Sequence, residues 1–211
     1  MMNKEDKKLE KKKLEKKKRV VELLGGIGSG KSRILEILES QYDAQIIQAD
    51  QVAKDLEKKG QPGYEGLVKQ FGQEILQEDG EIDKAKLAAV IFSDEKAMWH
   101  VNRIIHPLVW QEIKRWVEEK ESGLIVVETA LPDKKPGDIY DEVWYVYTLR
   151  ETRIRRLMES RGYSKERCIS MMENQPDTEE YWSLADYTID NSKTLEETEE
   201  QIRQLLGRDG E

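Results

Sequence analysis

The sequence predicts an α/β fold in which a parallel sheet is flanked by helices. Two observations lead to this prediction. Short apolar runs of the length of buried strands alternate with longer segments that have helical periodicity. One of these runs leads into a glycine-rich loop that is followed directly by a helical segment. Because strands that alternate with helices form parallel sheets covered on both faces, we expect one such sheet in this chain.

The first half of the sheet is predicted from two apolar runs. RVVELL predicts a buried strand over residues 19–24, and a helix is expected over 31–40 after the glycine-rich stretch. AQIIQA predicts a second strand over 44–49 that ends at Asp50. Four apolar residues are expected to form the inner face of the first helix: Ile34, Leu35, Ile37 and Leu38.

The middle of the chain, residues 51–121, differs from the flanking segments because it contains almost no apolar run typical of a strand. Helical segments there are separated by turns such as KKGQPGYEG and QEDGEID, which predicts a helical insertion. Pro107 disfavours a helical conformation at His106, so we expect one helix to end there and another to begin.

The remaining strands follow the insertion. LIVVE and VWYVYT predict strands over 124–128 and 143–148, and a helix is expected over 150–160. A short last strand over 185–191 then precedes a C-terminal helix over 194–206.

Charge and composition limit the classes of protein that the chain can belong to. The net charge is −8, but residues 1–19 carry +6 and the remainder −14. We expect 1–18 to be a basic N-terminal extension, disordered or helical, and we expect no nucleic-acid partner. The start of the chain has no apolar signal segment, Cys168 is the single cysteine, and no apolar run approaches the ~20 residues of a membrane span. We therefore expect a cytoplasmic protein that does not bind membranes.

The glycine-rich stretch GGIGSGKS contains the spacing of a phosphate-binding loop, from Gly25 through Gly30 to Lys31 and Ser32. Backbone N–H groups in such a loop, and the helix N-terminus behind it, attract an anion. Lys31 would reach the β- and γ-phosphates of a nucleoside triphosphate, and the Ser32 hydroxyl would be a ligand of Mg²⁺. A glycine turn without a ligand is the weaker alternative, because a chance match between a strand and a helix is rare.

Three further features are candidates for chemistry, each with a structural alternative. Asp50 could accept the proton of an attacking hydroxyl or could cap the helix that follows it. Glu128 could make an outer-sphere contact to Mg²⁺ or be an ordinary surface carboxylate. An arginine cluster could clamp a transferring phosphate or be solvated charge. This cluster comprises Arg150, Arg153, Arg155, Arg156 and Arg161.

From about residue 20 to 206 the chain resembles the dephospho-coenzyme A kinase family. The resemblance is spread over GGIGSGKS, QADQVAKDL, FGQEILQEDGEIDKAKLAAVIF, NRIIHPLV, RRLMESRGYS, MMENQ and ADYTIDNS. It implies a fold like that of the P-loop nucleoside triphosphate hydrolases, with a helical substrate-binding insertion and a small lid. On this basis we expect a single domain over 19–211, with the insertion over about 51–121 and the lid over about 153–176. One departure lies in 129–138, where two lysines and Pro132 shorten the family's apolar run.

The activity that the resemblance implies is transfer of the ATP γ-phosphoryl group to the ribose 3′-hydroxyl of dephospho-coenzyme A. The products would be coenzyme A and ADP, in the last step of coenzyme A synthesis, and Mg²⁺ would accompany ATP. We expect dephospho-coenzyme A as the small-molecule partner and a monomer or a weak homo-oligomer. Two alternatives are a kinase for another nucleoside or nucleotide acceptor, and a non-catalytic nucleotide-binding protein whose basic tail holds a partner.

The resemblance also implies roles for individual residues. Asp50 would face the acceptor hydroxyl, Lys31 would act on the phosphates, and Arg156 and Arg161 would belong to the lid. Nucleotide binding would involve Gly26, Ile27, Gly28, Ser29, Gly30, Lys31, Ser32, Asp190 and Asn191, the last two near the adenine. Ser32 and Glu128 would be the residues on the metal side.

Overall fold

The structure is a computed structural model that describes residues 18–94, 96–121, 123–130 and 139–207. Most of the basic extension and most of the segment 129–138 therefore lie outside the described residues. The chain divides into two compact units, the second of which is 47–118. The first unit combines the chain before this insertion with the chain after it.

A five-stranded sheet has the order β2-β3-β1-β4-β5. Strand β1 lies at its centre and runs parallel to both β3 and β4, and β4 runs parallel to β5. Val21 is opposite Val126 on one side and Glu142 on the other. The parallel α/β sheet predicted from the sequence is thereby confirmed. The strands are β1 (Arg19–Leu24), β2 (Gln45–Gln48), β3 (Leu124–Glu128), β4 (Glu142–Tyr147) and β5 (Tyr187–Asp190).

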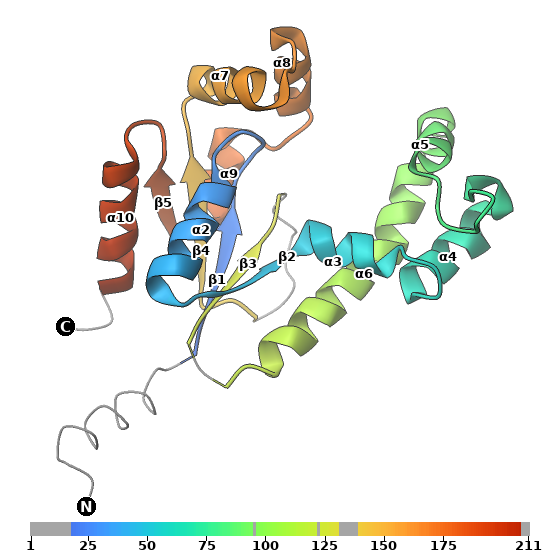
Figure 1. Ribbon diagram of the computed structural model, residues 1–211, viewed down its shortest axis with the longest axis horizontal. Coiled ribbons are helices and arrows are strands. Elements are labelled where there is room, and N and C mark those ends of the chain that lie inside the picture. Colours follow the sequence, from blue (N-terminus) through green and yellow to red (C-terminus); the bar gives the residue numbers. More distant parts are fainter. Residues whose placement is uncertain (1–17, 95, 122, 131–138, 208–211) are drawn as a thin grey trace, which may run out of the picture. The chain divides into compact units, whose positions relative to one another are not determined.

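Helices cover both faces of the sheet in the first unit (Figure 1). On one face Val21, Trp144 and Ile189 pack in a core with apolar residues of α2 (Lys31–Tyr42) and α10 (Leu195–Gly207). On the other face Tyr145 stacks on Tyr181 of α9 (Thr178–Leu184), with ring centroids 4.9 Å apart. Alternate residues of a strand point to opposite faces, so adjacent Trp144 and Tyr145 serve the two different cores.

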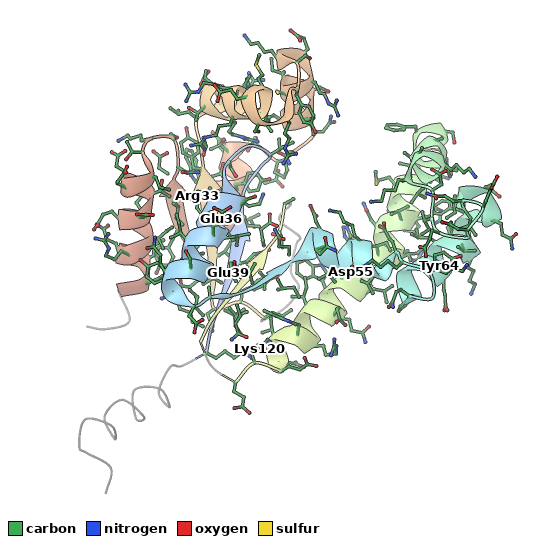
Figure 2. The ribbon with its side chains drawn as sticks, in the orientation of Figure 1. Arg33, Glu36, Glu39, Asp55, Tyr64 and Lys120 are labelled. Atoms are coloured by element: carbon green, nitrogen blue, oxygen red, sulfur yellow. The ribbon has the colours of Figure 1, made fainter. Side chains whose placement is uncertain are left out.

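Helix α2 follows the glycine-rich loop and is amphipathic, as its sequence predicts. Its outer face carries Arg33, Glu36 and Glu39, which are labelled in Figure 2. Arg33 and Glu36 form an exposed ion pair of 2.7 Å one turn apart. The four apolar residues expected on the inner face, Ile34, Leu35, Ile37 and Leu38, are all buried.

Three helices lie between β4 and β5. Helix α7 (Arg150–Arg161) was predicted, whereas α8 (Lys165–Glu173) and α9 were not indicated by the periodicity. Side-chain caps explain where these two begin. The Ser164 hydroxyl accepts the N–H of Arg167 at 3.2 Å, and the Asp177 carboxylate accepts the N–H of Glu180 at 2.8 Å.

The second unit is built from helices. Its longest helix, α6, packs against α3 and α4. No helix in the described part of the chain is both long and apolar enough to cross a membrane. The elements are α3 (Ala49–Leu56), α4 (Pro62–Phe71), the 3₁₀ turn η1 (Gln73–Ile75), α5 (Lys84–Ser93) and α6 (Ala97–Glu118).

The expected break at His106 and Pro107 is wrong, because α6 continues through both residues. Proline removes one helical hydrogen bond and crowds the preceding turn, at a cost of ~3 kcal/mol. An apolar stripe runs across the proline at four-residue spacing, and burial of these side chains offsets that cost. The stripe is formed by Ile105, Val109, Ile113 and Val117, while Pro107 is exposed.

Candidate functional site

The glycine-rich loop joins β1 to α2 in the first unit. Gly30 is the N-cap of α2 with φ +93°, in the left-handed region that favours glycine. A Cβ at this position would also collide with the side-chain amide of Asn191. The loop therefore turns directly into the N-terminus of α2, whose free N–H groups make a binding site for an anion such as phosphate.

Lys31 and Glu128, both predicted site residues, lie next to each other. Lys31 Nζ is 3.2 Å from Glu128 Oε1, and both side chains are only 12% exposed. The same ammonium group donates to the carbonyl oxygen of Gly25, at the start of the loop. Glu128 thus compensates the Lys31 charge, and a bound triphosphate would compete with this carboxylate for the ammonium group.

The carbonyl oxygen of Ser29 accepts three hydrogen bonds. The Thr148 hydroxyl and Asn191 Nδ2 each donate at 2.8 Å, and Arg156 Nη1 donates at 3.4 Å. Asn191 is fixed in turn, because its Oδ1 accepts the Thr198 hydroxyl at 3.1 Å and its backbone carbonyl accepts Arg156 Nη2 at 2.9 Å. Arg156 and Asn191 therefore bind the loop backbone directly.

Ile27, in the middle of the loop, is held by two side chains for which the sequence indicated no contact with the loop backbone. Arg153 Nε donates to the Ile27 carbonyl oxygen at 2.8 Å, and the Ile27 N–H donates to Gln175 Oε1 at 2.8 Å. Arg153 belonged to the predicted arginine cluster, but nothing separated it from its neighbours there. Gln175 carried no signal beyond its place in MMENQ.

Burial lowers the pKa of both arginines at the loop. For Arg153 the main cause is desolvation, and for Arg156 it is desolvation followed by repulsion from Arg155. The ordinary arginine pKa lies so far above neutrality that both guanidinium groups stay charged at pH 7. The loop is therefore flanked by two permanent cations.

Three other predicted residues occupy different surroundings. Asp190 ends β5, and its Oδ1 accepts the N–H of Ser192 at 2.9 Å. Ser32 directly follows Lys31 in the first turn of α2, where it is exposed. Arg161 is exposed and is the last residue of α7.

Asp50 belongs to the second unit, where it is exposed in the first turn of α3. The N-cap of this helix is Gln48, so the capping alternative for Asp50 is wrong. An acidic residue in the first turn still interacts favourably with the helix dipole. Its carboxylate is thus available for a role other than capping.

The donor set near the loop fits Mg²⁺ that arrives with a nucleotide. Within the described residues, no group of three or more His, Cys, Asp or Glu side chains is placed to hold a metal ion. Mg²⁺ in phosphate-transfer sites is held by one or two protein oxygen ligands together with substrate phosphates and water. The Ser32 hydroxyl would offer a ligand atom of this hard, oxygen type, and the Glu128 carboxylate would offer an acceptor for water bound to the ion.

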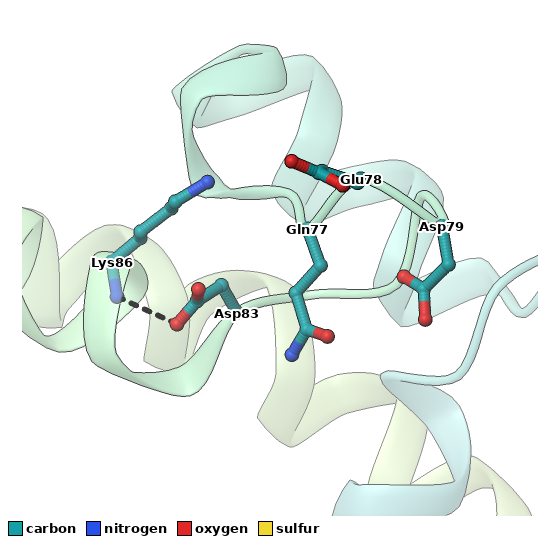
Figure 3. A pocket seen from close by; sticks show the side chains of 5 residues that line it. All are labelled: Gln77, Glu78, Asp79, Asp83 and Lys86. Atoms are coloured by element: carbon teal, nitrogen blue, oxygen red, sulfur yellow. Dashed lines mark hydrogen bonds between the residues drawn. The ribbon is translucent and has the colours of Figure 1, made fainter.

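The second unit contains a hollow of its own (Figure 3). Its charged groups serve the local structure. Asp83 caps α5 by accepting the N–H groups of Ala85 and Lys86, and Lys86 Nζ donates to the carbonyl oxygen of Leu76 at 2.5 Å. We assign no ligand to this hollow, which is lined by Gln77, Glu78, Asp79, Asp83 and Lys86.

Comparison with known proteins gives matches over most of the chain. The family model for dephospho-CoA kinase matches residues 19–197. A dephospho-CoA kinase from Carboxydothermus hydrogenoformans is 38% identical, over 89% of this chain and 92% of its own length. The solved structure of TT1252 from Thermus thermophilus has a TM-score of 0.77 at 25% identity, over 92% of this chain and 98% of that chain. The structure of dephospho-CoA kinase from Campylobacter jejuni has the same fold, with a TM-score of 0.65 at 22% identity over 91% of this chain and 99% of that one. This chain, with its phosphate loop between β1 and α2, belongs to the dephospho-CoA kinase family.

Proposed function

We propose that this chain is a phosphotransferase that moves the γ-phosphoryl group of ATP to the ribose 3′-hydroxyl of dephospho-CoA. The products are CoA and ADP, in the final step of CoA synthesis. The observation that carries this proposal is the family match over residues 19–197. The loop between β1 and α2 supports it, because its glycines, Lys31 and Ser32 have the arrangement of a triphosphate site.

In this proposal the loop residues 26–32 bind the phosphates through backbone N–H groups and the N-terminus of α2. Lys31 Nζ exchanges Glu128 for the β- and γ-phosphates, and Asp190 and Asn191 border the adenine. Ser32 would be a ligand of Mg²⁺ and Glu128 would contact the ion in its outer sphere, and the bound ion would neutralise charge on the phosphates. Arg156 and Arg161 belong to a lid of about 153–176 that stabilises the charge of the transferring group.

Asp50 is proposed to accept the proton of the attacking hydroxyl. The 3′-oxygen of the acceptor forms a bond to the γ-phosphorus, the bond from that phosphorus to the bridging oxygen breaks, and ADP leaves. The hydroxyl proton passes to the Asp50 carboxylate. Support comes from its exposed position in the first turn of α3, where it is not used as a cap.

A coupled ADP-release assay with dephospho-CoA, adenosine and AMP as acceptors tests the proposal. We expect dephospho-CoA to have the highest kcat/KM, and Lys31→Ala to abolish turnover. Asp50→Asn should lower kcat by about 10²-fold or more while the Kd for ATP stays near the wild-type value, because general-base help is worth about 10²–10⁴.

Asp55→Asn is the matched control, since it removes a second exposed carboxylate from the same helix (Figure 2). Asp55 pairs with Lys58 at 2.6 Å, an exposed contact that contributes little to stability. The turnover of the Asp55→Asn variant should equal that of the wild type.

Two results would contradict the proposal. A higher kcat/KM with adenosine or AMP would exclude dephospho-CoA as the natural acceptor, and a near-normal kcat for Asp50→Asn would remove the proposed base.

A further inference from the structure

The backbone of Ile27, in the phosphate loop, forms a ring of three hydrogen bonds with the side chains of Arg153 and Gln175. Ile27 N–H donates to Gln175 Oε1 at 2.8 Å, and Arg153 Nε donates to the Ile27 carbonyl oxygen at 2.8 Å. Arg153 Nη2 completes the ring by donating to Gln175 Oε1 at 3.2 Å. Both polar groups of the Ile27 backbone are therefore bound by side chains that lie 126 and 148 residues later in the chain.

These contacts determine the orientation of two peptide planes. The Ile27 N–H lies in the plane shared with Gly26, and the Ile27 carbonyl lies in the plane shared with Gly28. In a trans peptide the C=O and N–H groups point in opposite directions. Because Arg153 holds the Ile27 carbonyl, the N–H of Gly28 must point away from Arg153.

The surroundings allow little other geometry. A Cβ at residue 26 would collide with the guanidinium group of Arg153 and with the amide oxygen of Gln175, so the pair lies tightly over Gly26. One edge of the guanidinium group reaches both the Ile27 carbonyl and Gln175, which a single lysine ammonium at the end of a flexible chain would not reproduce.

We propose that Arg153 and Gln175, together called the Ile27 brace, are positioning residues that hold the phosphate loop in its binding shape before the nucleotide arrives. The inference rests on the proposed function, because it assumes that the loop binds the phosphates of ATP. The Ile27 N–H binds Gln175, whereas the Gly28 N–H points away from Arg153 and is available to bind a phosphate of the nucleotide.

The brace should act on nucleotide affinity more than on the chemical step. A loop that is mobile in the free protein must be ordered when the nucleotide binds, and the free-energy cost of this ordering reduces the affinity. Ordering one further backbone residue weakens binding by about tenfold. Once the phosphates are bound they hold the loop themselves, so turnover at saturating ATP changes little.

Gln175→Leu tests the proposal, because leucine has a similar size and no acceptor. We expect the Kd for ADP with Mg²⁺, measured by calorimetry, and the KM for ATP each to rise about tenfold. The KM for dephospho-CoA should be unchanged and kcat should stay within about threefold. Arg153→Lys should shift the ADP affinity in the same direction.

Gln204→Leu is the matched control. Gln204 is exposed on α10, where its amide donates to Glu200 Oε1 at 3.0 Å, and its loss should leave ADP affinity as in the wild type. If Gln175→Leu fails to fold, Gln175→Asn shortens the side chain by one methylene group, keeps it polar, and should weaken ADP binding in the same way.

Two results would overturn the proposal. A lower melting temperature with unchanged ADP affinity would mean that the contacts only stabilise the fold. Tighter ADP binding in Gln175→Leu would mean that Gln175 competes with phosphate for the Ile27 N–H. Because ADP binding requires no acceptor, a wild-type protein that fails to phosphorylate dephospho-CoA would contradict the proposed function and leave this measurement intact.

Discussion

The replacement Asn191→Asp tests how strongly the phosphate loop is anchored at Ser29. Asn191 is 6% exposed, and both atoms of its amide are hydrogen-bonded within the protein. Aspartate keeps the shape and still accepts the Thr198 hydroxyl. It replaces the donor Nδ2, however, by an oxygen that faces the Ser29 carbonyl oxygen at the 2.8 Å now spanned by the hydrogen bond.

The expected loss follows from that contact. One hydrogen bond disappears, and a buried acceptor faces another acceptor without a proton between them, which together lower the free energy of unfolding by about 2–4 kcal/mol. In a chain of this size each kcal/mol corresponds to about 2–4 °C in Tm. The melting temperature at pH 7 should therefore fall by about 4–16 °C.

The loss should also depend on pH. Burial and the facing Ser29 carbonyl oxygen disfavour the charged form of the carboxyl group introduced by Asn191→Asp, which could donate to Ser29 again once it is protonated. Arg156 favours the charged form, but its guanidinium group already donates to the carbonyl oxygens of Ser29 and Asn191, so we expect the folded-state pKa to lie above the unfolded value of about 3.9. The folded variant then binds more protons than the unfolded one, and its stability falls as the pH rises from about 3.9 through the folded-state pKa. The deficit relative to wild type is largest above that pKa and shrinks on acidification.

Thermal unfolding monitored by circular dichroism between about pH 4.5 and 8 measures these effects. Asn174→Asp is the matched control, because Asn174 Nδ2 also donates to a carbonyl, that of Ser170, at 2.9 Å, but is exposed. The control should change the free energy of unfolding by about 0.5 kcal/mol or less. Equal losses in the two variants, or a deficit that grows on acidification, would refute the reasoning.

Two further predictions concern the segment between β4 and β5. Arg161→Ala should lower kcat by about 10²-fold with little change in KM, because in the proposed function Arg161 belongs to a lid and acts on charge that develops in the transition state. Steady-state kinetics that show a change in KM alone would reassign Arg161 to ground-state binding. Burial raises the pKa of Tyr181 to about 12, whereas the unfolded pKa is about 10. Between these values the folded state keeps the phenol proton and the unfolded state loses it. The contribution of this proton to the free energy of unfolding of the wild type therefore falls by about 2 kcal/mol between pH 10 and 12. Tyr181→Phe should remove that contribution and, at pH 7, cost about 1 kcal/mol through the lost 2.9 Å hydrogen bond to the Ala130 carbonyl. Urea unfolding from pH 7 to 11 measures the loss of the hydrogen bond and about the first half of the pH-dependent fall. An identical pH slope in the two proteins would contradict the Tyr181 prediction.

Elements whose signal is local could be predicted from the sequence. Strands β1 and β3 have the predicted bounds, because each is an apolar run with a turn at its end. Helix α2 extends two residues beyond its predicted end, to Tyr42, and its inner face is as expected. The loop could be identified because its glycines, Lys31 and Ser32 occur at fixed spacing in one short stretch.

Features that depend on tertiary contacts could not be predicted in this way. The stripe through Ile105 and Val109 outweighs Pro107, and no local rule weighs those two effects. The partners of the loop backbone, among them Thr148 and Gln175, lie more than a hundred residues away in the chain. Nothing in the sequence distinguished Arg153, which binds Ile27, from the other arginines of its cluster.

The guanidinium groups of Arg153 and Arg156 bind carbonyl oxygens of the loop, whereas Lys31 faces the carboxylate of Glu128. Their positive charges therefore remain available to an approaching anion while the lysine charge is compensated. In an otherwise acidic protein this gives the loop a local positive potential, which attracts a polyanion over about a Debye length. The rate at which nucleotide associates should accordingly fall with ionic strength, even though the net charge of −8 would by itself predict the opposite.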